Sequence, residues 1–255
     1  MRIAVITGAS SGMGREFVRQ IAEYERFDEV WVIARRAERL LELQKECPFP
    51  VRAVSLDLSR EESFETYCAL LEAEQPQIGL LINCAGYGKF GRVDELSLPD
   101  QLGMIDLNAK ALTAVTNLSL PYLHAGDKVL QLDSLSAFQP VPYLAVYGAT
   151  KAYVLSYSRA LNAELKKQGI RVLAVSPGWV QTEFFDRAMT PGNDAVTYFN
   201  KVYSADFVVK KALCAMYRTK KDLCIPGLPV WGQTLLVKLL PHRLVMRIWL
   251  KQQKH

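Results

Sequence analysis

Cysteine is scarce in this chain of 255 residues, and it follows no pattern that would hold a metal or a disulfide framework. The five cysteines form no CxxC pair and no cluster with histidine, and their number is odd. This usage excludes a structural zinc site and a disulfide-stabilised fold, and no metal is expected in any functional site. It predicts free thiols in a reducing compartment, which we take to be the cytoplasm.

Long hydrophobic runs are also missing. The longest uncharged run near the carboxyl end, residues 223–237, contains two prolines and two glycines, so it is too short and too broken for a spanning helix. The opening residues, MRIAVITG, leave no room for a signal peptide. Repeats, linkers and low-complexity segments are absent, and the 50% hydrophobic content is ordinary for a globular protein. These features predict one domain over residues 1–255.

Acidic residues are scarce in the last part of the chain. From Lys201 onward there are eleven lysines and arginines but two acids, so this part carries +9 while the first 200 residues carry −4. The excess indicates a solvated basic face or, alternatively, a surface for a membrane, an acidic partner or an anionic substrate. Leucines at helical spacing on both sides of Pro241 predict two short amphipathic helices at about 231–251. These helices would pack on the domain, on a second subunit or, weakly, on a membrane surface; no nucleic-acid partner is predicted.

Short apolar, β-branched runs alternate along the chain with longer helical patterns. The runs that predict strands are 3–7, 30–34, 51–56, 80–83, 128–132 and 172–176. Apolar residues recur at helical spacing over 14–24, 37–45, 63–73, 100–118 and 147–167. The alternation predicts an α/β fold of the Rossmann type, a doubly wound parallel sheet with helices on both faces.

A glycine-rich turn, TGASSGMG, follows the first predicted strand and contains Gly8, Gly12 and Gly14. Glycine allows a sharp turn and a close approach to a pyrophosphate, which the unpaired N–H groups of a helix start bind well. The spacing differs from the familiar G-x-G-x-x-G, and a tight turn without a ligand is the alternative interpretation. The order of strand, turn and helix favours a dinucleotide site.

The second predicted strand ends in two arginines. An NAD site needs an acid at this point to accept from the ribose 2′-hydroxyl, whereas this chain has Arg35 and Arg36. Guanidinium groups bind a 2′-phosphate, so the sequence favours NADP(H) over NAD(H). The alternative is that both arginines are solvated charges at the start of a helix.

Tyr147 and Lys151 are four residues apart in YGATK, so on a helix they share a face. A nearby ammonium lowers the pKa of a phenol and makes it a proton donor or acceptor for a carbonyl or alcohol. Ser134 follows the fifth predicted strand, at the edge where α/β sheets bind ligands, and could hold the same substrate oxygen. Ser136, two residues further on, is a less favoured substitute.

With these motifs the chain resembles the short-chain dehydrogenase/reductase family, in its compact single-domain form, over about residues 2–182. The matching motifs are TGASSGMG, Asp57 in SLDLS, NCAG at 83–86, Asn108 in IDLNAKA, Ser134, YGATK and PGWVQT at 177–182. The resemblance implies about seven strands, the last around 222–225. It also implies a homodimer or homotetramer formed through the helices at about 100–118 and 147–167.

The resemblance implies a role for each matched residue. Tyr147 would be the general acid/base, and Lys151 would lower its pKa and bind the nicotinamide ribose. Ser134 would position the carbonyl, and Asn108 would support a water relay. The implied cofactor-binding residues are Gly8, Ser10, Ser11, Gly12, Met13, Gly14, Arg35, Arg36, Asp57, Asn83, Ala85, Gly86, Tyr147, Lys151, Pro177, Gly178, Val180 and Thr182. Cys84 departs from the family's NNAG, which puts local hydrogen bonding in doubt more than the chemistry.

The sequence thus predicts an NADP(H)-dependent oxidoreductase that interconverts a ketone or aldehyde with an alcohol. An irregular, aromatic-rich stretch at about 179–204 predicts a substrate loop. The side chains that favour a hydrophobic substrate (a steroid, an acyl ketone or an aromatic carbonyl) are Tyr143, Trp179, Phe184, Phe185, Met189, Tyr198 and Phe199. They could equally form the loop's own small core. The alternative functions are a non-catalytic NADP(H)-binding regulator and, less favoured, an enzyme like the nucleotide-sugar epimerases.

Overall fold

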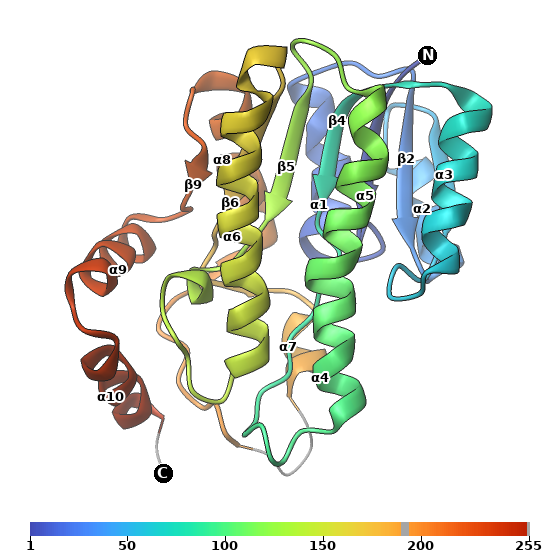
Figure 1. The fold of residues 1–255 in the computed structure, drawn as a ribbon. Helices are drawn as coiled ribbons and strands as arrows, with labels where there is room; N and C mark the ends of the chain where they lie inside the picture. Colours follow the sequence, from blue (N-terminus) through green and yellow to red (C-terminus); the bar gives the residue numbers. More distant parts are fainter. Residues whose placement is uncertain (190–193, 254–255) are drawn as a thin grey trace.

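A seven-stranded parallel sheet forms the centre of the molecule (Figure 1). The computed structural model describes residues 1–189 and 194–253. The strands lie in the order β3-β2-β1-β4-β5-β6-β9. Their bounds are β1 (Arg2–Thr7), β2 (Glu29–Ala34), β3 (Val51–Ser55), β4 (Gln77–Asn83), β5 (Lys128–Leu132), β6 (Arg171–Val175) and β9 (Leu223–Cys224). All seven strands expected from the sequence and the family resemblance are thereby confirmed.

Helices cover both faces of this sheet, as a doubly wound fold requires (Figure 1). One face carries α1 (Gly12–Gln20), α2 (Ala37–Glu42) and α8 (Ala205–Arg218). The other carries α3 (Glu62–Glu74), α5 (Leu112–Ser119) and α6 (Ala145–Leu165). Both faces of the sheet are therefore buried, which explains why its strands read as continuous apolar runs.

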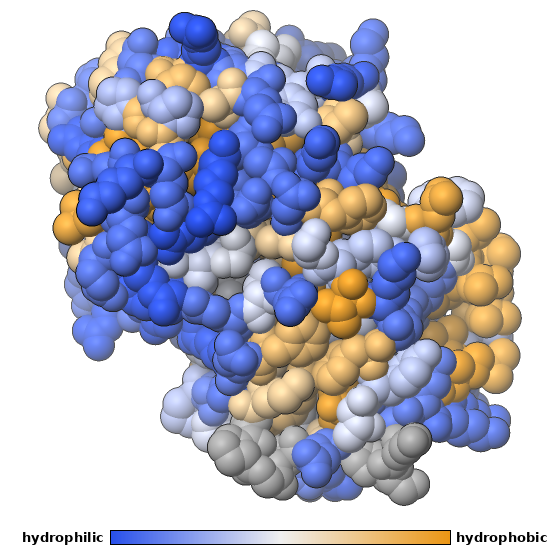
Figure 2. Space-filling view, turned by 180° about the vertical axis from the view of Figure 1, so that it is seen from behind, coloured by the Kyte–Doolittle hydropathy of each residue, from blue (hydrophilic) through white to orange (hydrophobic). Residues whose placement is uncertain are grey.

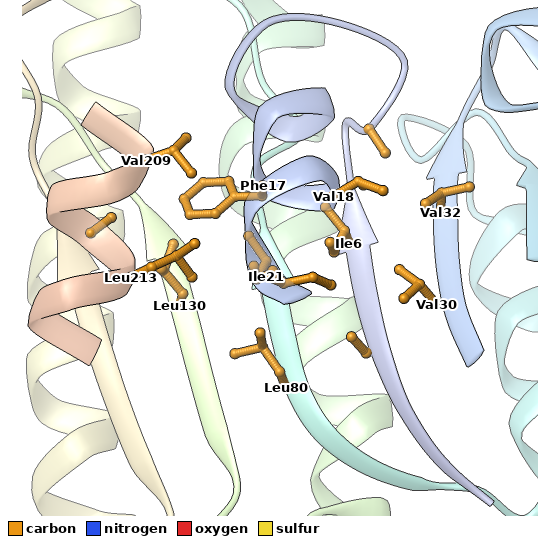
Figure 3. Close-up of a cluster of buried hydrophobic side chains, with 14 of the residues drawn as sticks. Ile6, Phe17, Val18, Ile21, Val30, Val32, Leu80, Leu130, Val209 and Leu213 are labelled. Atoms are coloured by element: carbon orange, nitrogen blue, oxygen red, sulfur yellow. The ribbon is translucent and has the colours of Figure 1, made fainter. Parts of the chain in front are cut away.

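Two buried clusters fill the space between the sheet and its helices. Successive strand residues point to opposite faces, so Ile6 of β1 belongs to one cluster and Val5 to the other. In Figure 3, Phe17 of α1 points toward Val209 and Leu213 of α8. Ile6 of β1 belongs to the same cluster as Phe17 and Val18 of α1, so this packing holds the helix against the strand to which the glycine-rich turn connects it.

The helix predicted at 100–118 is interrupted by a π-helical segment. α4 (Leu98–Ile105) is followed by a π-helix over Asp106–Ala111 and then by α5. The segment contains Asn108, and such bulges are frequent at functional sites. The sequence pattern did not predict this feature. It also did not predict α8, although Ser204 before it accepts a hydrogen bond from the Phe207 amide as a helix cap.

The stretch predicted as a substrate loop has some regular structure of its own. It contains β7 (Trp179–Gln181), α7 (Phe184–Ala188) and β8 (Val202–Ser204), and the two strands pair in parallel. Its residues 190–193 lie outside the described part of the chain. At the carboxyl end, α9 (Leu228–Leu239) and α10 (His242–Gln252) confirm the two predicted short helices. Among the described helices, none has the length and hydropathy to cross a membrane.

Candidate active site

A cavity of about 560 Å³ opens at the carboxyl ends of the strands, beside β1 and β4, where the strand order reverses. This is the place where open α/β sheets bind their ligands. The structure brings together at its wall nearly all the residues that the sequence singled out. Those that line it are Gly8, Ser10, Ser11, Gly12, Met13, Gly14, Arg35, Arg36, Asp57, Ala85, Gly86, Ser134, Tyr147, Lys151, Pro177, Gly178, Val180 and Thr182.

The glycine-rich turn forms a cradle that side chains would fill. Gly8 has a φ of +70°, and a Cβ on it would lie 2.8 Å from the Cα of Ala85. A Cβ on Gly14 would lie 2.2 Å from the carbonyl oxygen of Gly8. The side chain of Ser11 makes no capping bond to α1, so the first N–H groups of the helix remain available. These residues fit the pyrophosphate of a dinucleotide.

The two arginines after β2 differ in their surroundings. Arg36 donates to the hydroxyl of Ser10 at 3.1 Å and pairs with Glu183 at 2.8 Å. Arg35 is exposed, and among the described residues it forms no ion pair, so it is free to meet an anion. The sequence offered no reason to distinguish the two arginines, and it did not predict the ion pair between Arg36 and Glu183.

Asp57 lies at the wall of the cavity, within reach of the charge of Arg35. Burial opposes ionisation of its carboxyl group, but hydrogen bonds from the hydroxyl and amide of Ser59, with the charges of Arg35 and Arg60, hold its pKa below the ordinary value. The side chain is therefore an ionised acceptor at neutral pH, as the adenine-side acid of the family pattern requires.

Tyr147 and Lys151 share one face of α6, as predicted, and both are buried. The Nζ of Lys151 lies 5.8 Å from the Tyr147 ring centroid and donates to the carbonyl of Leu132 at 2.8 Å. The expected lowering of the phenol pKa is not found. Burial raises the pKa of Tyr147, the hydrogen bond with Ser134 opposes this rise, and the charge of Asp133 adds to it. Desolvation is the largest of these contributions, and the lowering by Lys151 stays a prediction.

Asp133 is a site residue that sequence reasoning missed. It is 2% exposed, and its Oδ2 accepts a hydrogen bond from the hydroxyl of Ser176 at 2.5 Å. Burial raises its pKa to about 7, while the Ser176 bond and the charge of Lys151 act in the opposite direction. Burial also lowers the pKa of Lys151, which the charge of Asp133 opposes. Its position directly before Ser134, at the end of β5, was the signal that could have identified it.

Ser134 and Ser136 both line the cavity, but they are oriented by different contacts. Ser134 caps the short 3-10 helix that follows β5, where its Oγ accepts from the amide of Ser136 at 3.2 Å, and it is hydrogen-bonded to Tyr147. The hydroxyl of Ser136 is buried and has no protein partner among the described residues. The geometry therefore favours Ser134 over Ser136 beside the phenol.

Two predicted site residues, Asn83 and Asn108, do not line the cavity. Asn83 is buried and donates to Thr116 at 2.9 Å, so its side chain supports the sheet. Asn108 accepts from the amide of Tyr87 at 2.9 Å and donates to the carbonyl of Tyr87 and to Thr150. Its amide thus ties α6, close to Tyr147, to the loop after β4.

Thr7 supplies the local hydrogen bonding that Cys84 had placed in doubt. The backbone amides of Cys84 and Ala85 both donate to the Thr7 hydroxyl at 3.1 Å. Burial raises the pKa of the Cys84 thiol to about 12, so it behaves as a small apolar side chain packed on the core. The exchange of asparagine for cysteine is accommodated by the neighbouring strand.

The aromatic residues of the 179–204 stretch divide between the cavity and a core of their own. Phe184 lies with its ring centroid 5.4 Å from that of Tyr147, and Trp179 and Tyr198 also line the cavity. Phe185 and Phe199 pack together at 5.1 Å instead. Of the other predicted pocket residues, Tyr143 and Met189 do not line it, and Met189 is exposed. Both interpretations of this stretch are thus partly right.

The carboxyl-terminal helix α10 also contributes to the site. Trp249 and Gln252 line the cavity, and the indole N–H of Trp249 donates to the carbonyl of Pro142 at 3.0 Å. Gln253, just after the helix, accepts from the amides of Thr197 and Tyr198. No local motif pointed to these residues. Across the described residues, no group of three or more side chains is arranged to hold a metal ion.

Comparison with known proteins agrees with this geometry. The family model for short chain dehydrogenases matches residues 2–191. An uncharacterized oxidoreductase of Staphylococcus epidermidis is 30% identical over 76% of this chain and 82% of its own length. Sulfoacetaldehyde reductase 2 of Chromohalobacter salexigens is 36% identical over 71% and 74%.

Solved structures show the same relationship. A short-chain dehydrogenase from Sphingobium yanoikuyae, in complex with NADPH, superimposes with a TM-score of 0.79 at 30% identity, covering 96% of this chain and 95% of that one. The motifs, the sheet and these relatives lead to one conclusion. The chain belongs to the short-chain dehydrogenase family of oxidoreductases.

Proposed function

We propose that this protein is an NADP(H)-dependent oxidoreductase that interconverts a hydrophobic ketone or aldehyde with its alcohol. The observation that carries the proposal is the convergence of Tyr147, Ser134 and Lys151 on one cavity, between a glycine cradle and an aromatic wall. The NADPH in the related Sphingobium structure supports the cofactor, and the related sulfoacetaldehyde reductase supports carbonyl reduction.

The residues of the chain divide the work between binding and proton transfer. The glycine cradle and the start of α1 would hold the pyrophosphate, and Arg35 the 2′-phosphate, of a cofactor that supplies the hydride. Burial keeps the Tyr147 phenol protonated at neutral pH, so in the reductive direction it donates its proton to the carbonyl oxygen. Ser134 donates a second hydrogen bond to that oxygen, and the Nζ of Lys151 lies 5.8 Å from the centroid of the phenol ring.

The aromatic wall of the cavity, which includes Phe184 beside Tyr147, indicates the substrate class. Phe184, Trp179 and Tyr198 line the cavity together with Leu144 and Trp249. Such a wall gains free energy from the burial of apolar substrate surface. We therefore infer a steroid, an acyl ketone or an aromatic carbonyl as the substrate class.

A panel of carbonyl compounds tests the proposed function. NADPH is the cofactor, and the loss of its absorbance is the readout. We expect kcat/KM to be at least about tenfold higher for bulky apolar ketones than for small polar aldehydes. Sulfoacetaldehyde is the matched polar comparison because a related enzyme is named for its reduction. If NADPH binds but no carbonyl in the panel is reduced, the non-catalytic NADP(H)-binding alternative replaces this proposal.

Cofactor preference gives a second prediction. Arg35→Ala should raise the Kd for NADPH by about tenfold or more and leave the Kd for NADH nearly unchanged. The reason is that the exposed guanidinium is available to bind the 2′-phosphate. Kd values from fluorescence titration of both cofactors provide the measurement. Arg26→Ala removes the same charge from an exposed site before β2 and is the control. Equal losses for the two cofactors in Arg35→Ala would contradict the preference.

Subunit association is part of the same proposal. Leu98, Leu102 and Ile105 of α4 and Tyr153 of α6 are exposed, large and apolar, on the helices that the family resemblance assigns to subunit contacts. We infer a homodimer or homotetramer through this face. The single domain and the cytoplasmic location stay predictions.

A further inference from the structure

We propose that α9 and α10 form a docking surface for the anionic face of a lipid bilayer. This proposal rests on the proposed function in one respect, because the surface adjoins the cavity that would take an apolar substrate. The docking surface consists of exposed apolar side chains and of basic ones. They are Leu228, Trp231, Leu235, Leu236, Lys238, Leu239, Arg243, Leu244, Arg247, Ile248, Leu250 and Lys251.

The apolar part of the docking surface is unusually exposed for a folded protein. Val230, Thr234 and Val237 turn one side of α9 toward the domain, where they are buried. The other side presents Leu228 and Leu239, which are 84% and 75% exposed. In Figure 2 hydrophobic side chains gather along the right-hand edge, where this helix lies. An apolar face of this extent marks an interaction site.

The charge of the same surface has one sign. From residue 223 to residue 253 the sequence contains no aspartate or glutamate. Arg243, Arg247 and Lys251 follow one another at four-residue spacing on α10, beside Leu244 and Ile248 at the same spacing. Within the described part of the chain none of these three cations forms a salt bridge. Cations beside an apolar stripe are typical of helices that lie in the interface of an anionic membrane.

Charge also argues against a second copy of the chain as the occupant. A two-fold interface through α9 and α10 would bring the same uncompensated cations of both copies together. The exposed apolar face of α4 is different. Asp100 lies in α4, and Asp106 directly follows it and pairs with Lys110, so acidic and basic side chains both lie near this face. The charges therefore favour α4 for contacts between subunits, and they favour α9 and α10 for contact with an anionic lipid surface.

The docking surface shares its helices with the cavity. Trp249 and Gln252 of α10 and Gln233 of α9 line the cavity, while Leu244 and Ile248 of α10 are exposed. Figure 1 shows both helices beside the main body, at the end of the molecule where the strands terminate. A bilayer bound to them would lie next to the cavity, so an apolar carbonyl dissolved in the lipid could enter without crossing water.

Vesicle binding by the full chain tests this proposal. We expect co-sedimentation with phosphatidylcholine vesicles that contain phosphatidylserine to be at least about tenfold stronger than with phosphatidylcholine alone, and to weaken with added salt. Arg247→Glu with Lys251→Glu should abolish the preference for phosphatidylserine, and Leu235→Gln with Leu239→Gln should weaken binding to both. Lys166→Glu with Lys167→Glu, at exposed positions after α6, makes the same charge change and should have no effect.

Two results would overturn the proposal. One is vesicle binding that is absent, or that the docking-surface variants leave unchanged. The other is a shift of Leu235→Gln with Leu239→Gln from oligomer to monomer in light scattering, without vesicle binding, which would identify a second copy as the occupant. Reduction of a water-soluble ketone is measured on the same preparations. Reductase activity without vesicle binding would contradict only the proposal of a docking surface. Vesicle binding without reductase activity would contradict only the proposed function.

Discussion

Tyr147→Phe is expected to lower kcat for carbonyl reduction by about 10²–10⁴-fold and to leave NADPH binding intact. The substitution removes one hydroxyl from a buried ring that is held by Phe184 and by α6, so the cavity keeps its shape. It removes the only proton donor that we assign to the carbonyl oxygen. Initial rates of NADPH oxidation with the best ketone of the panel, beside a fluorescence titration of NADPH, measure the two effects separately.

Tyr153→Phe on the same helix is the matched control. Its hydroxyl lies 2.8 Å from that of Thr113, and the residue is exposed, so the same chemical change should leave turnover within about twofold of the parent. Undiminished turnover in Tyr147→Phe would exclude the phenol as the proton donor. A parallel loss of NADPH affinity would show that Tyr147 acts in binding instead.

The raised pKa of Tyr147 bears on which form of its phenol the site holds. A protonated phenol is the form that carbonyl reduction consumes, whereas alcohol oxidation needs the phenolate. Burial raises the pKa of the phenol, so the protonated form that reduction consumes is the favoured one in this site. The ammonium of Lys151 stands close to the ring, so it favours the phenolate that forms after the proton has been transferred.

The second large effect is expected for Gly14→Ala. The new Cβ would lie 2.2 Å from the carbonyl oxygen of Gly8, so the turn and the start of α1 must move apart. We expect a loss of about 1–3 kcal/mol in the free energy of unfolding from this overpacking. With the cradle displaced, kcat/KM for NADPH should fall by about 10²-fold. Urea unfolding and steady-state kinetics provide the measurements.

Gly232→Ala in α9 is the control for this substitution. It makes the same change inside a helix, but a Cβ there meets nothing within 4 Å. Alanine is the better helix former by about 1 kcal/mol, so this variant should be equally or more stable and should bind NADPH normally. If Gly14→Ala behaves like Gly232→Ala, the turn is not the tight cradle that the structure shows.

Much of the fold could be predicted from local patterns. Apolar runs marked the strands, and helical spacing marked most of the helices, because burial on both sheet faces imposes these patterns on neighbouring residues. The site's location followed as well, since strand ends in a parallel sheet meet at one edge. For the same reason the glycine turn and Ser134 could be assigned to one site, and the family resemblance added Tyr147 and Lys151 to it.

The sequence by itself therefore determined the elements, the edge of the sheet where the site lies and the residue types that reach it. Only the tertiary structure decided that Asn83 and Asn108 bond to Thr116 and Tyr87, that Glu183 pairs with Arg36, and that Trp249 lines the cavity. It also decided the sign of the Tyr147 pKa shift. The reason is physical: periodicity and turn chemistry depend on neighbours in the chain, whereas desolvation and side-chain pairing depend on segments that meet only after folding.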